Sequence, residues 1–358
     1  RDALLGRALH DIDIAVERDA MAFARALANR AGGHFVELDD ANAIARVVLP
    51  ERAARHVDVA QLQGTLADDL RRRDFTIDAL AAPLRGGDVV DVTGGLADLE
   101  AHLVRMVSAV ALDDDPLRTL RGARIASELG FAIEPATAAA IRERAMTVRS
   151  AAGERRRDEL ARILALPSAY DGLRLLDDLA LLEALLPEVT FGRGVTQPDN
   201  WHAYDVFEHN VRAVEAIDII VAEAAPADAS RVFIWQGFWD VFAWCEGDLR
   251  AYLAEELSEG RSRVMLLRFA ALLHDVAKPQ TRTVEDGGRI RFFGHAEEGA
   301  TIAGRIMRRL RFSSAETRLV RRLVAEHLRP VQLAQVGEVP TRRAVYRFYR
   351  DLGDAAPA

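Results

Sequence analysis

Hydrophobic and polar residues follow two different patterns along the chain. In about the first hundred residues, apolar positions with period two predict short strands at 11–16, 44–49, 57–62 and 89–92, and a helix at 19–31 that two glycines end. Beyond about residue 103, apolar residues recur at helical spacing, which predicts helices at 116–131, 136–148, 155–166, 170–185, 205–224, 261–277, 295–310 and 315–327. We therefore predict a small α+β head followed by a larger, all-helical part.

The composition is that of an ordinary globular protein with more than one domain. At 358 residues the chain is too long for a single core, and 50% of its residues are hydrophobic and 28% charged. The formal net charge of −8 excludes a general nucleic-acid binder, so any polyanion site must be a local patch. A single cysteine excludes an intrachain disulfide, which is typical of a cytoplasmic protein.

No apolar run approaches the length of about twenty residues that a membrane span needs, so we expect no membrane partner. The densest apolar stretch, 232–244, is interrupted by Gln236 and Asp240. It predicts a buried helix, and a surface for a partner is the alternative.

Two aspartates on the first predicted strand are candidate metal ligands. Asp11 and Asp13 are two residues apart, which places both carboxylates on one face of a strand. This spacing suits a pair of Mg²⁺ ions that stabilise an in-line phosphoryl displacement. We expect the third carboxylate to come from a neighbouring strand, and Asp58 is the best candidate. The alternative is the solvent face of an edge strand.

The context of this pair resembles a known family. Residues 1–7, with Arg1 and Asp2, followed by 10–14, resemble the opening motif of class II tRNA nucleotidyltransferases and bacterial poly(A) polymerases. The resemblance implies that Arg1 holds phosphates. In that family a Gly-Gly-x-Val segment precedes this motif and cradles the triphosphate. We expect the chain to be a piece of a longer protein without that segment, and to bind nucleotide weakly.

Residues 72–80 are similar to the second signature of the family. The resemblance implies that Arg73 contacts the incoming nucleotide, and a guanidinium fork matches phosphate geometry. Many family members have Asn at the position of Asp78. The alternative interpretation is a helix start with Asp74 as N-cap.

Residues 114–124 resemble the nucleotide-selecting helix of the family. Arg118, Arg121 and Arg124 share one helical face and repel one another, and a bound triphosphate would remove the repulsion. A solvated basic face is the alternative. Asp115 would accept from the amino group of cytosine or adenine while Arg118 donates to the ring nitrogen. UTP and GTP would leave polar groups unpaired, at about 1–3 kcal/mol each.

Two further segments resemble parts of the family. Residues 91–99 predict a structural turn. Residues 153–160 contain Glu154 and Arg155, which we expect to brace the neck, and Arg156 and Arg157, which would meet RNA phosphates. A solvated helix start is the alternative.

The helical part contains a set of dispersed histidines. His274–Asp275 ends one predicted helix, and His209, His295 and His327 lie on others, so they can converge on one divalent metal. The pattern resembles the HD phosphohydrolase superfamily, which implies that His209, His274 and Asp275 are ligands and that His295 and His327 are further ligands or phosphate contacts. HD domains add a last aspartate from a later helix, and Asp351 and Asp354 do not fit that role. A purely structural, RNA-holding body is the alternative.

The resemblance implies a polymerase-beta-like α+β nucleotidyltransferase head at 1–105, an all-α neck at 106–166 and an HD-type helical body at 167–358 that ends early. It implies transfer of nucleotides from CTP and ATP to the 3′ end of tRNA, with Mg²⁺ in the head and a divalent metal of unknown identity in the body. We expect the acids of the head and the arginine face of the neck to act on one magnesium–triphosphate. The alternatives are a poly(A) polymerase, a CC- or A-adding enzyme, an HD phosphohydrolase with a degenerate head, and a non-catalytic RNA-binding protein. The oligomeric state is left open.

Overall fold

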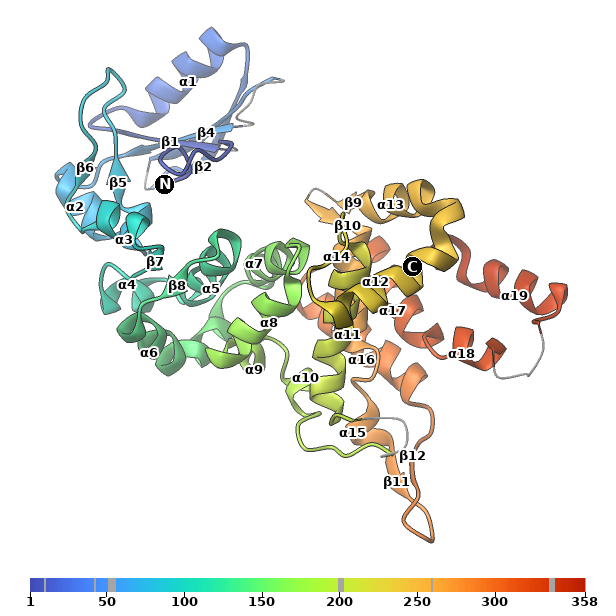
Figure 1. The fold of residues 1–358 in the computed structure, drawn as a ribbon. Helices are drawn as coiled ribbons and strands as arrows, with labels where there is room; N and C mark the ends of the chain where they lie inside the picture. Colours follow the sequence, from blue (N-terminus) through green and yellow to red (C-terminus); the bar gives the residue numbers. More distant parts are fainter. Residues whose placement is uncertain are drawn as a thin grey trace. The chain divides into compact units, whose positions relative to one another are not determined.

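The computed structural model describes residues 1–9, 11–41, 43–50, 56–198, 203–258, 260–334 and 339–357. The chain divides into two compact units, Arg1–Asp114 and Asp115–Ala358 (Figure 1). The second unit contains the predicted body and the predicted neck from Asp115 onward, whereas α4 (Ala109–Asp114) belongs to the first unit. The boundaries at 105 and 166 stay predictions.

A four-stranded sheet forms the core of the first unit. Its strand order is β1-β4-β3-β2, with β1 and β4 parallel and the other pairs antiparallel. Helix α1 covers one face and buries Ala20, Ala24 and Ala28 against Val47 and Val59 (Figure 1). The elements are β1 Asp11–Val16, α1 Ala20–Ala31, β2 His34–Asp39, β3 Ile44–Val48 and β4 His56–Gln61. Because side chains alternate along a strand, Asp11, Asp13 and Asp58 lie on the other face of the sheet.

Short elements complete the first unit below the sheet. Gly95 is required at the start of α3, because a Cβ there would lie 2.1 Å from the carbonyl oxygen of Thr76. The elements are α2 Leu66–Arg71, η1 Thr76–Asp78, β5 Leu80–Ala81, β6 Val90–Asp91, α3 Gly95–Glu100, β7 Leu103–Val104 and α4 Ala109–Asp114.

The second unit is almost entirely helical, as predicted. Helices α5, α7 and α8 pack together at its beginning, and α11, α14 and α17 pack together further along the chain. The helices of eight or more residues are α5 Leu117–Leu129, α6 Pro135–Arg144, α7 Gly153–Ala165, α8 Ala169–Asp178, α11 Val206–Val221, α12 Ala229–Phe242, α13 Glu246–Ala254, α14 Arg263–Leu273, α16 His295–Arg309, α17 Ser314–Glu326 and α19 Arg342–Leu352. The shorter elements are β8 Ala132–Ile133, η2 Ala145–Ser150, α9 Leu181–Leu185, α10 Pro187–Thr190, η3 Ala243–Cys245, β9 Glu256–Ser258, β10 Arg261–Ser262, α15 Lys278–Thr281, β11 Arg282–Val284, β12 Ile290–Phe292, α18 Arg329–Ala334 and η4 Gly353–Ala355.

The structure differs from the predicted elements at a few points. The predicted helix at 170–185 is two helices, because Ala180 adopts a left-handed conformation with φ 58°. Strand β2 and the β11–β12 hairpin were not predicted. In β2 the apolar residues Val36 and Leu38 are exposed, so the strand lacks a clean alternation of buried and exposed positions.

The expectation that the apolar stretch 232–244 is buried is wrong. Within α12 only Trp239 is buried, whereas Phe233 is 79% exposed and Trp244, just beyond the helix, 84%. The apolar residues surround the helix on all sides, so packing against one neighbour cannot cover them. Among the described residues, no helix is long and apolar enough to cross a membrane.

Candidate active site and metal centre

The acid pair of the first unit lies on the face of the sheet opposite α1. Asp11 and Asp13 belong to β1, and Ile14 of the same strand packs into the core beneath the helix. Strand β4 runs parallel to β1 and sets Asp58 in register with Asp13. Residues in register share a face, so the structure brings the three acids to one side. The Asp58 carboxylate accepts hydrogen bonds of 2.7 and 2.8 Å from the Arg46 guanidinium.

The electrostatics of these acids fit a divalent cation. Removal from water raises the pKa of Asp13, Arg73 acts to lower it, and the carboxylates of Asp11 and Asp58 raise it further. A cation between the carboxylates would relieve their repulsion. Among the described residues, however, the three acids do not converge into one compact group of ligands. The roles of Asp11, Asp13 and Asp58 stay predictions.

The predicted phosphate-binding arginines of this unit have acidic neighbours. Arg1 donates to Asp2 at 3.0 Å and to Asp78 at 2.9 Å. Asp78 therefore ties the second signature to the first. Arg73 lies 3.5 Å from Asp69, one helical turn earlier, and its side chain is 41% exposed.

The signature at 72–80 contains no α-helix start at Asp74. Its carboxylate accepts from the next backbone N–H, that of Phe75, at 3.0 Å, and only the single 3₁₀ turn η1 follows. The alternative interpretation of Asp74 as a helix N-cap is therefore wrong. The predicted turn at 91–99 is confirmed, because the Asp91 carboxylate accepts four backbone N–H groups at 2.8 to 3.0 Å.

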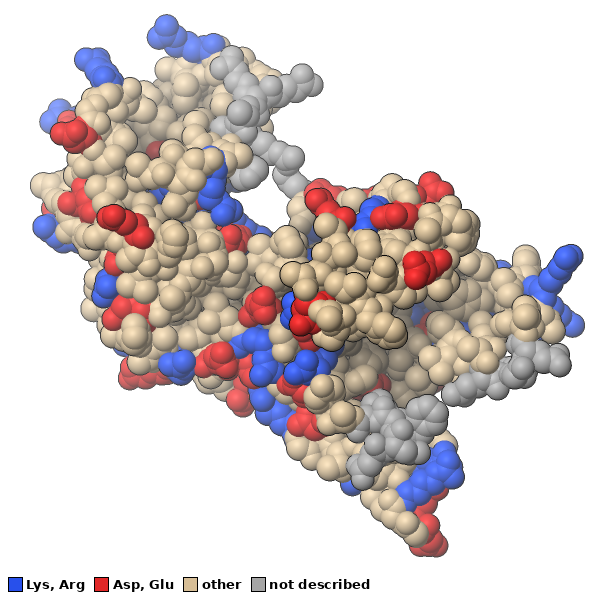
Figure 2. Space-filling model, in the orientation of Figure 1, with Lys and Arg blue, Asp and Glu red and all other residues tan. Residues whose placement is uncertain are grey.

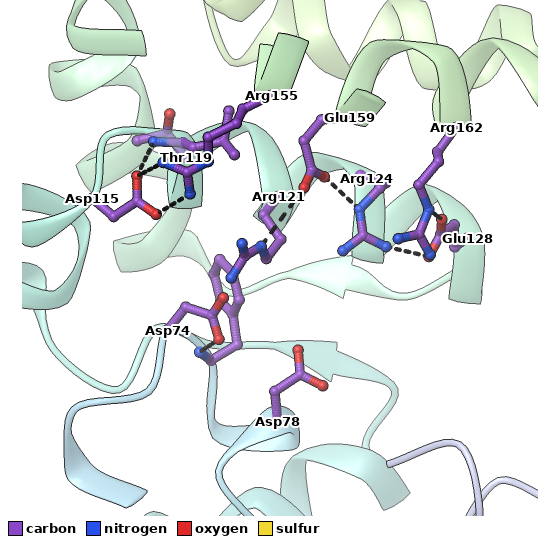
Figure 3. A network of polar contacts seen from close by, with 12 residues as sticks. Asp74, Asp78, Asp115, Thr119, Arg121, Arg124, Glu128, Arg155, Glu159 and Arg162 are labelled. Atoms are coloured by element: carbon purple, nitrogen blue, oxygen red, sulfur yellow. Dashed lines mark hydrogen bonds and ion pairs between the residues drawn. The ribbon is translucent and has the colours of Figure 1, made fainter. Parts of the chain in front are cut away.

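In the second unit, ion pairs join the arginine-bearing helix α5 to α7. We call the set Asp115–Arg155, Arg124–Glu159 and Glu128–Arg162 the α5–α7 ladder (Figure 3). Its closest N–O distances are 2.7, 2.5 and 2.9 Å in that order. The ladder confirms the prediction that Arg155 braces the neck.

The ladder also corrects the prediction that the arginines of α5 repel one another unless a triphosphate is bound. Arg124 is 5% exposed and donates to both Glu159 and Glu128, and Arg121 lies 3.7 Å from Glu159. Carboxylates of the protein therefore neutralise this part of the face without a triphosphate. Arg118 and Arg121 are half-buried, and the assignment of the three arginines to nucleotide binding stays a prediction.

Asp115 is held in place by a partner that the sequence did not link to it. Arg155 donates to its carboxylate, and the N–H of Leu117 donates to it at 3.1 Å. Burial acts to raise the pKa of Asp115, but these hydrogen bonds outweigh burial and lower it. The side chain is thus an ionised acceptor with a fixed orientation.

The four histidines and the aspartate converge in the helical part, as predicted. His209 lies on α11, His274 and Asp275 follow α14, His295 begins α16 and His327 follows α17. The Oδ2 atom of Asp275 lies 3.3 Å from the Nε2 of His209 and 3.2 Å from that of His274. Its Oδ1 atom lies 3.3 Å from the Nε2 of His295 and 3.6 Å from that of His327. Asp275 is therefore shared by two groups of candidate ligands.

The donor atoms of the cluster fit a divalent metal. The Nδ1 atoms of His274, His295 and His327 lie 2.7, 2.7 and 2.8 Å from backbone carbonyls, which orients each ring. The Nε2 atoms of His295 and His327 and the Oδ1 of Asp275 are buried without a hydrogen-bond partner among the described residues. Buried polar atoms are normally satisfied, so these donors fit a divalent metal. The identity of the ligands stays a prediction.

Two residues of this centre were missed by the sequence analysis. Lys278, buried, places its Nζ 2.5 Å from Asp275 and 2.6 Å from the side-chain oxygen of Gln197. Burial acts to raise the pKa of Asp275, but His274 and His209 hold it well below its usual value. The spacing of Lys278, three residues after Asp275, was the available signal. Gln197 lies in a loop and gave none.

The late aspartates lie elsewhere, in agreement with the expectation. Asp351 is 2.8 Å from Arg329, and Asp354 is 3.4 Å from Arg263. Neither belongs to the described groups of candidate ligands.

Acids on the open face of an α+β sheet and a His–Asp cluster in a helical body define a nucleotidyltransferase head joined to an HD-type body. Three family models match the chain: the poly A polymerase head domain at residues 1–105, the probable RNA and SrmB-binding site of polymerase A at 130–191, and the HD domain at 249–351. The chain belongs to the tRNA nucleotidyltransferase and poly(A) polymerase family.

Characterised relatives match almost the whole chain. An A-adding tRNA nucleotidyltransferase of Deinococcus radiodurans is 37% identical over 99% of this chain and 72% of its own length. A CC-adding tRNA nucleotidyltransferase of Thermus thermophilus is 34% identical over 100% of this chain and 71% of its own length. Among solved structures, the Thermotoga maritima CCA-adding enzyme complexed with tRNA has a TM-score of 0.63 at 21% identity, covering 99% of this chain and 70% of that one. This likeness supports the fold.

Proposed function

We propose that the protein transfers nucleotides from CTP and ATP to the 3′ end of tRNA without a template. The observation that carries this proposal is the parallel register of β1 and β4, which puts Asp11 and Asp13 beside Asp58 on the open face of the sheet. The A-adding and CC-adding relatives support the choice of nucleotides and of tRNA. We expect the protein to act in the cytoplasm.

In the proposed reaction the 3′-hydroxyl of tRNA attacks the α-phosphate and pyrophosphate leaves. Asp11 and Asp13, with Asp58 as the third acid, would hold divalent ions, for which we propose Mg²⁺. Such ions supply charge stabilisation at the attacking and leaving oxygens. Arg73 and Arg1 would bind phosphate oxygens, each already oriented by a neighbouring acid.

We propose that Asp115 and Arg118 select the base. The ionised Asp115 accepts but cannot donate, so it favours bases with an amino group at that position, which cytosine and adenine have. Arg118 donates to the adjacent ring nitrogen. Arg121 would contact the nucleotide, and Arg124, buried in the α5–α7 ladder, would support the face from behind.

An incorporation assay tests the proposal. The protein is incubated with tRNA lacking its terminal CCA, Mg²⁺ and each labelled nucleotide alone and in pairs. We expect incorporation of C, of A, or of C followed by A. Addition of C alone or A alone would identify a CC- or A-adding enzyme, and long A tails would identify a poly(A) polymerase. No incorporation on any tRNA end would refute nucleotidyl transfer.

The buried atoms of the His–Asp cluster favour a second activity, the hydrolysis of phosphate esters. Unpartnered Nε2 and Oδ1 atoms around Asp275, with Lys278 beside them, suit metal-dependent hydrolysis of phosphate esters. The test is ring opening of a cyclic phosphodiester, in which water cleaves one P–O ester bond and leaves a phosphomonoester, in the presence of Mn²⁺, Ni²⁺, Zn²⁺ or Mg²⁺. Ring opening that is lost in His274→Ala and Asp275→Asn would support hydrolysis, and ring opening unchanged in both variants would refute it.

A further inference from the structure

The open face of the sheet in the first unit carries an ion pair beside the candidate catalytic acids. Arg46 of β3 lies directly opposite Asp58 of β4, and Asp58 lies directly opposite Asp13 of β1. Ala45 and Val59, their neighbours in the sequence, are buried on the side of the sheet that α1 covers. Because side chains alternate along a strand, Arg46, Asp58 and Asp13 form one row across the open face.

The contact between Arg46 and Asp58 fixes the orientation of the carboxylate. The Nε of Arg46 donates to the Oδ1 of Asp58 at 2.7 Å, and its Nη2 donates to the Oδ2 at 2.8 Å. Two parallel hydrogen bonds define the plane of a carboxylate, which a single bond leaves free to rotate. An ionised carboxylate has about four lone-pair sites, so both oxygens of Asp58 can still accept another ligand.

A structural role accounts poorly for this ion pair. On the face shown in Figure 2, basic side chains lie beside acidic ones in small groups, so pairing alone says little about function. Strands β3 and β4 are already paired through their backbones from Ile44 to Val48. The side chains of Arg46 and Asp58 are 37% and 24% exposed, and ion pairs with such exposure contribute little to stability.

Arg46 also places a positive charge near the acids that would hold divalent ions. Three carboxylates are the hard oxygen ligands that Mg²⁺ takes. Adjacent strands lie about 4.8 Å apart, so two strand spacings, roughly 10 Å, separate Arg46 from Asp13. A unit charge at that distance changes the affinity for a cation by roughly two- to tenfold. Arg46 therefore orients one candidate ligand and at the same time opposes the binding of a cation.

We propose that Arg46 is a positioning residue of the nucleotidyl-transfer site, which holds Asp58 in a fixed orientation and by its charge keeps the affinity for the free divalent ion low. The roles of the acids in this inference rest on the proposed function. A site that binds the free ion weakly depends on the triphosphate to complete it, since Mg²⁺ is bound through one or two carboxylates plus substrate phosphates.

The first test measures Mn²⁺ binding in the absence of nucleotide, by electron paramagnetic resonance. For Arg46→Gln, which removes the charge, we expect a roughly two- to tenfold tighter Kd. For Asp58→Asn, which replaces a candidate ligand with a neutral amide, we expect weaker binding. Arg30→Gln is the control, because Arg30 is an exposed residue of α1 on the other side of the sheet, and it should bind Mn²⁺ like the wild type. The His–Asp cluster is the same in every variant, so differences between the titrations report on the head.

The second test measures incorporation of CTP and ATP as a function of Mg²⁺ concentration. For Arg46→Gln we expect half-saturation at a lower Mg²⁺ concentration and a maximal rate roughly ten- to a hundredfold lower, because a small misplacement of a site residue is costly. Arg46→Lys keeps the charge without the fork, so it should keep the Mg²⁺ dependence of the wild type and recover only part of the rate. A merely structural role would not combine tighter metal binding with slower turnover.

Thermal unfolding completes the distinction between positioning and structure. The Tm of Arg46→Gln should lie within about 3 °C of the wild type, because a partly exposed ion pair adds little stability. Weaker Mn²⁺ binding or a clearly lower Tm in Arg46→Gln would overturn the proposal in favour of a structural ion pair. An unchanged maximal rate would overturn it as well.

The Mn²⁺ titration keeps this inference apart from the proposed function. If the wild-type protein added no nucleotide to any tRNA end, the proposed function would fail, whereas tighter Mn²⁺ binding in Arg46→Gln would still establish that this arginine controls the affinity of the acids for a cation. If the wild type added nucleotides and Arg46→Gln changed neither the Kd for Mn²⁺ nor the rate, only the role of Arg46 would fail.

Discussion

The two candidate metal centres of this protein are built in opposite ways. In the head, Asp11 and Asp13 come from one strand on an open face, and the neighbouring Asp58 is held by Arg46. In the body, four histidines on or beside four different helices surround the buried Asp275, and the rings of three of them are oriented by backbone carbonyls. One centre is an exposed motif, and the other is an enclosed cluster.

The two centres therefore differ in how each would bind a metal ion. An open pair of acids is completed by the substrate, because Mg²⁺ keeps several waters and binds through few carboxylates plus phosphates. A buried cluster with unpartnered atoms is formed in advance, so a metal bound there also stabilises the fold. Mutations in the head should therefore change catalysis with little effect on stability, and changes at the body centre should alter stability.

The largest effect is expected from Asp13→Asn. Loss of the charge on the open face should reduce nucleotide incorporation by roughly a thousandfold, or about 4 kcal/mol, because divalent ions would lose a ligand. The Tm should stay within about 2 °C of the wild type, since substitutions of exposed residues change stability little. Glu37→Gln, an exposed acid on β2, is the control and should keep full activity. A large loss of Tm in Asp13→Asn would show that the acids of the head also stabilise the fold, which would contradict the proposed difference between the two centres.

The second effect is a metal-dependent shift in stability. At about a hundred times its Kd, a bound metal should stabilise the body by about 2.7 kcal/mol, or roughly 5–10 °C in Tm. Calorimetry with Mn²⁺, Ni²⁺ or Zn²⁺ before and after chelation measures this shift. Asp275→Asn replaces the carboxylate shared by both groups of ligands with a neutral amide and should abolish this shift. A shift that survives in this variant would place the metal elsewhere.

The fold could be predicted where one local pattern decided the outcome. Period-two alternation located β1, β3 and β4, and helical spacing located α11, α16 and α17. The break at Ala180 could not be predicted, because apolar residues continue across it without a glycine or proline. The exposure of α12 was missed because burial depends on how much surface its neighbours offer.

The residues of the candidate site, like the elements of the fold, could be predicted only where a local sequence pattern identified them. Motif spacing identified the acids of β1, and the histidines were found because helix spacing made their convergence plausible. The polar contacts that hold the site residues in place were not predicted, because their partners lie far apart in the sequence. The separations are 12 residues for Arg46 and Asp58, 40 for Asp115 and Arg155, and 81 for Gln197 and Lys278. Such pairs are set by tertiary packing, for which a single sequence carries no local signal.

The α5–α7 ladder shares a property with each of the two metal centres. Its first pair, Asp115–Arg155, is a preformed contact within the protein, and it is also partly exposed to solvent. Asp115→Ala should reduce discrimination between CTP and UTP by roughly 5- to 150-fold, about 1–3 kcal/mol, because the acceptor for the amino group is lost. Turnover of CTP should fall less than selectivity. Competition between labelled CTP and UTP measures the ratio. Unchanged discrimination would refute the role of Asp115.

The smallest and sharpest effect concerns Arg155. In Arg155→Gln, Asp115 keeps the N–H of Leu117 but loses its charged partner, so its carboxylate becomes free to rotate. We expect discrimination between CTP and UTP to fall roughly three- to tenfold, with partial recovery in Arg155→Lys.

Arg162→Gln is the matched control for Arg155→Gln, because Arg162 forms the last pair of the same ladder, with Glu128, and is similarly exposed. If the ladder only holds two helices together, both variants should lower the rates with CTP and UTP in parallel. If Arg155 positions the base-selecting acid, only Arg155→Gln should change their ratio. Base selectivity would then depend on the contact between Arg155 and Asp115 as much as on the residues that touch the base. The base-selecting acid would be exposed to substrate, like the acids of the head, and held in place by the protein before substrate binds, like the His–Asp cluster of the body.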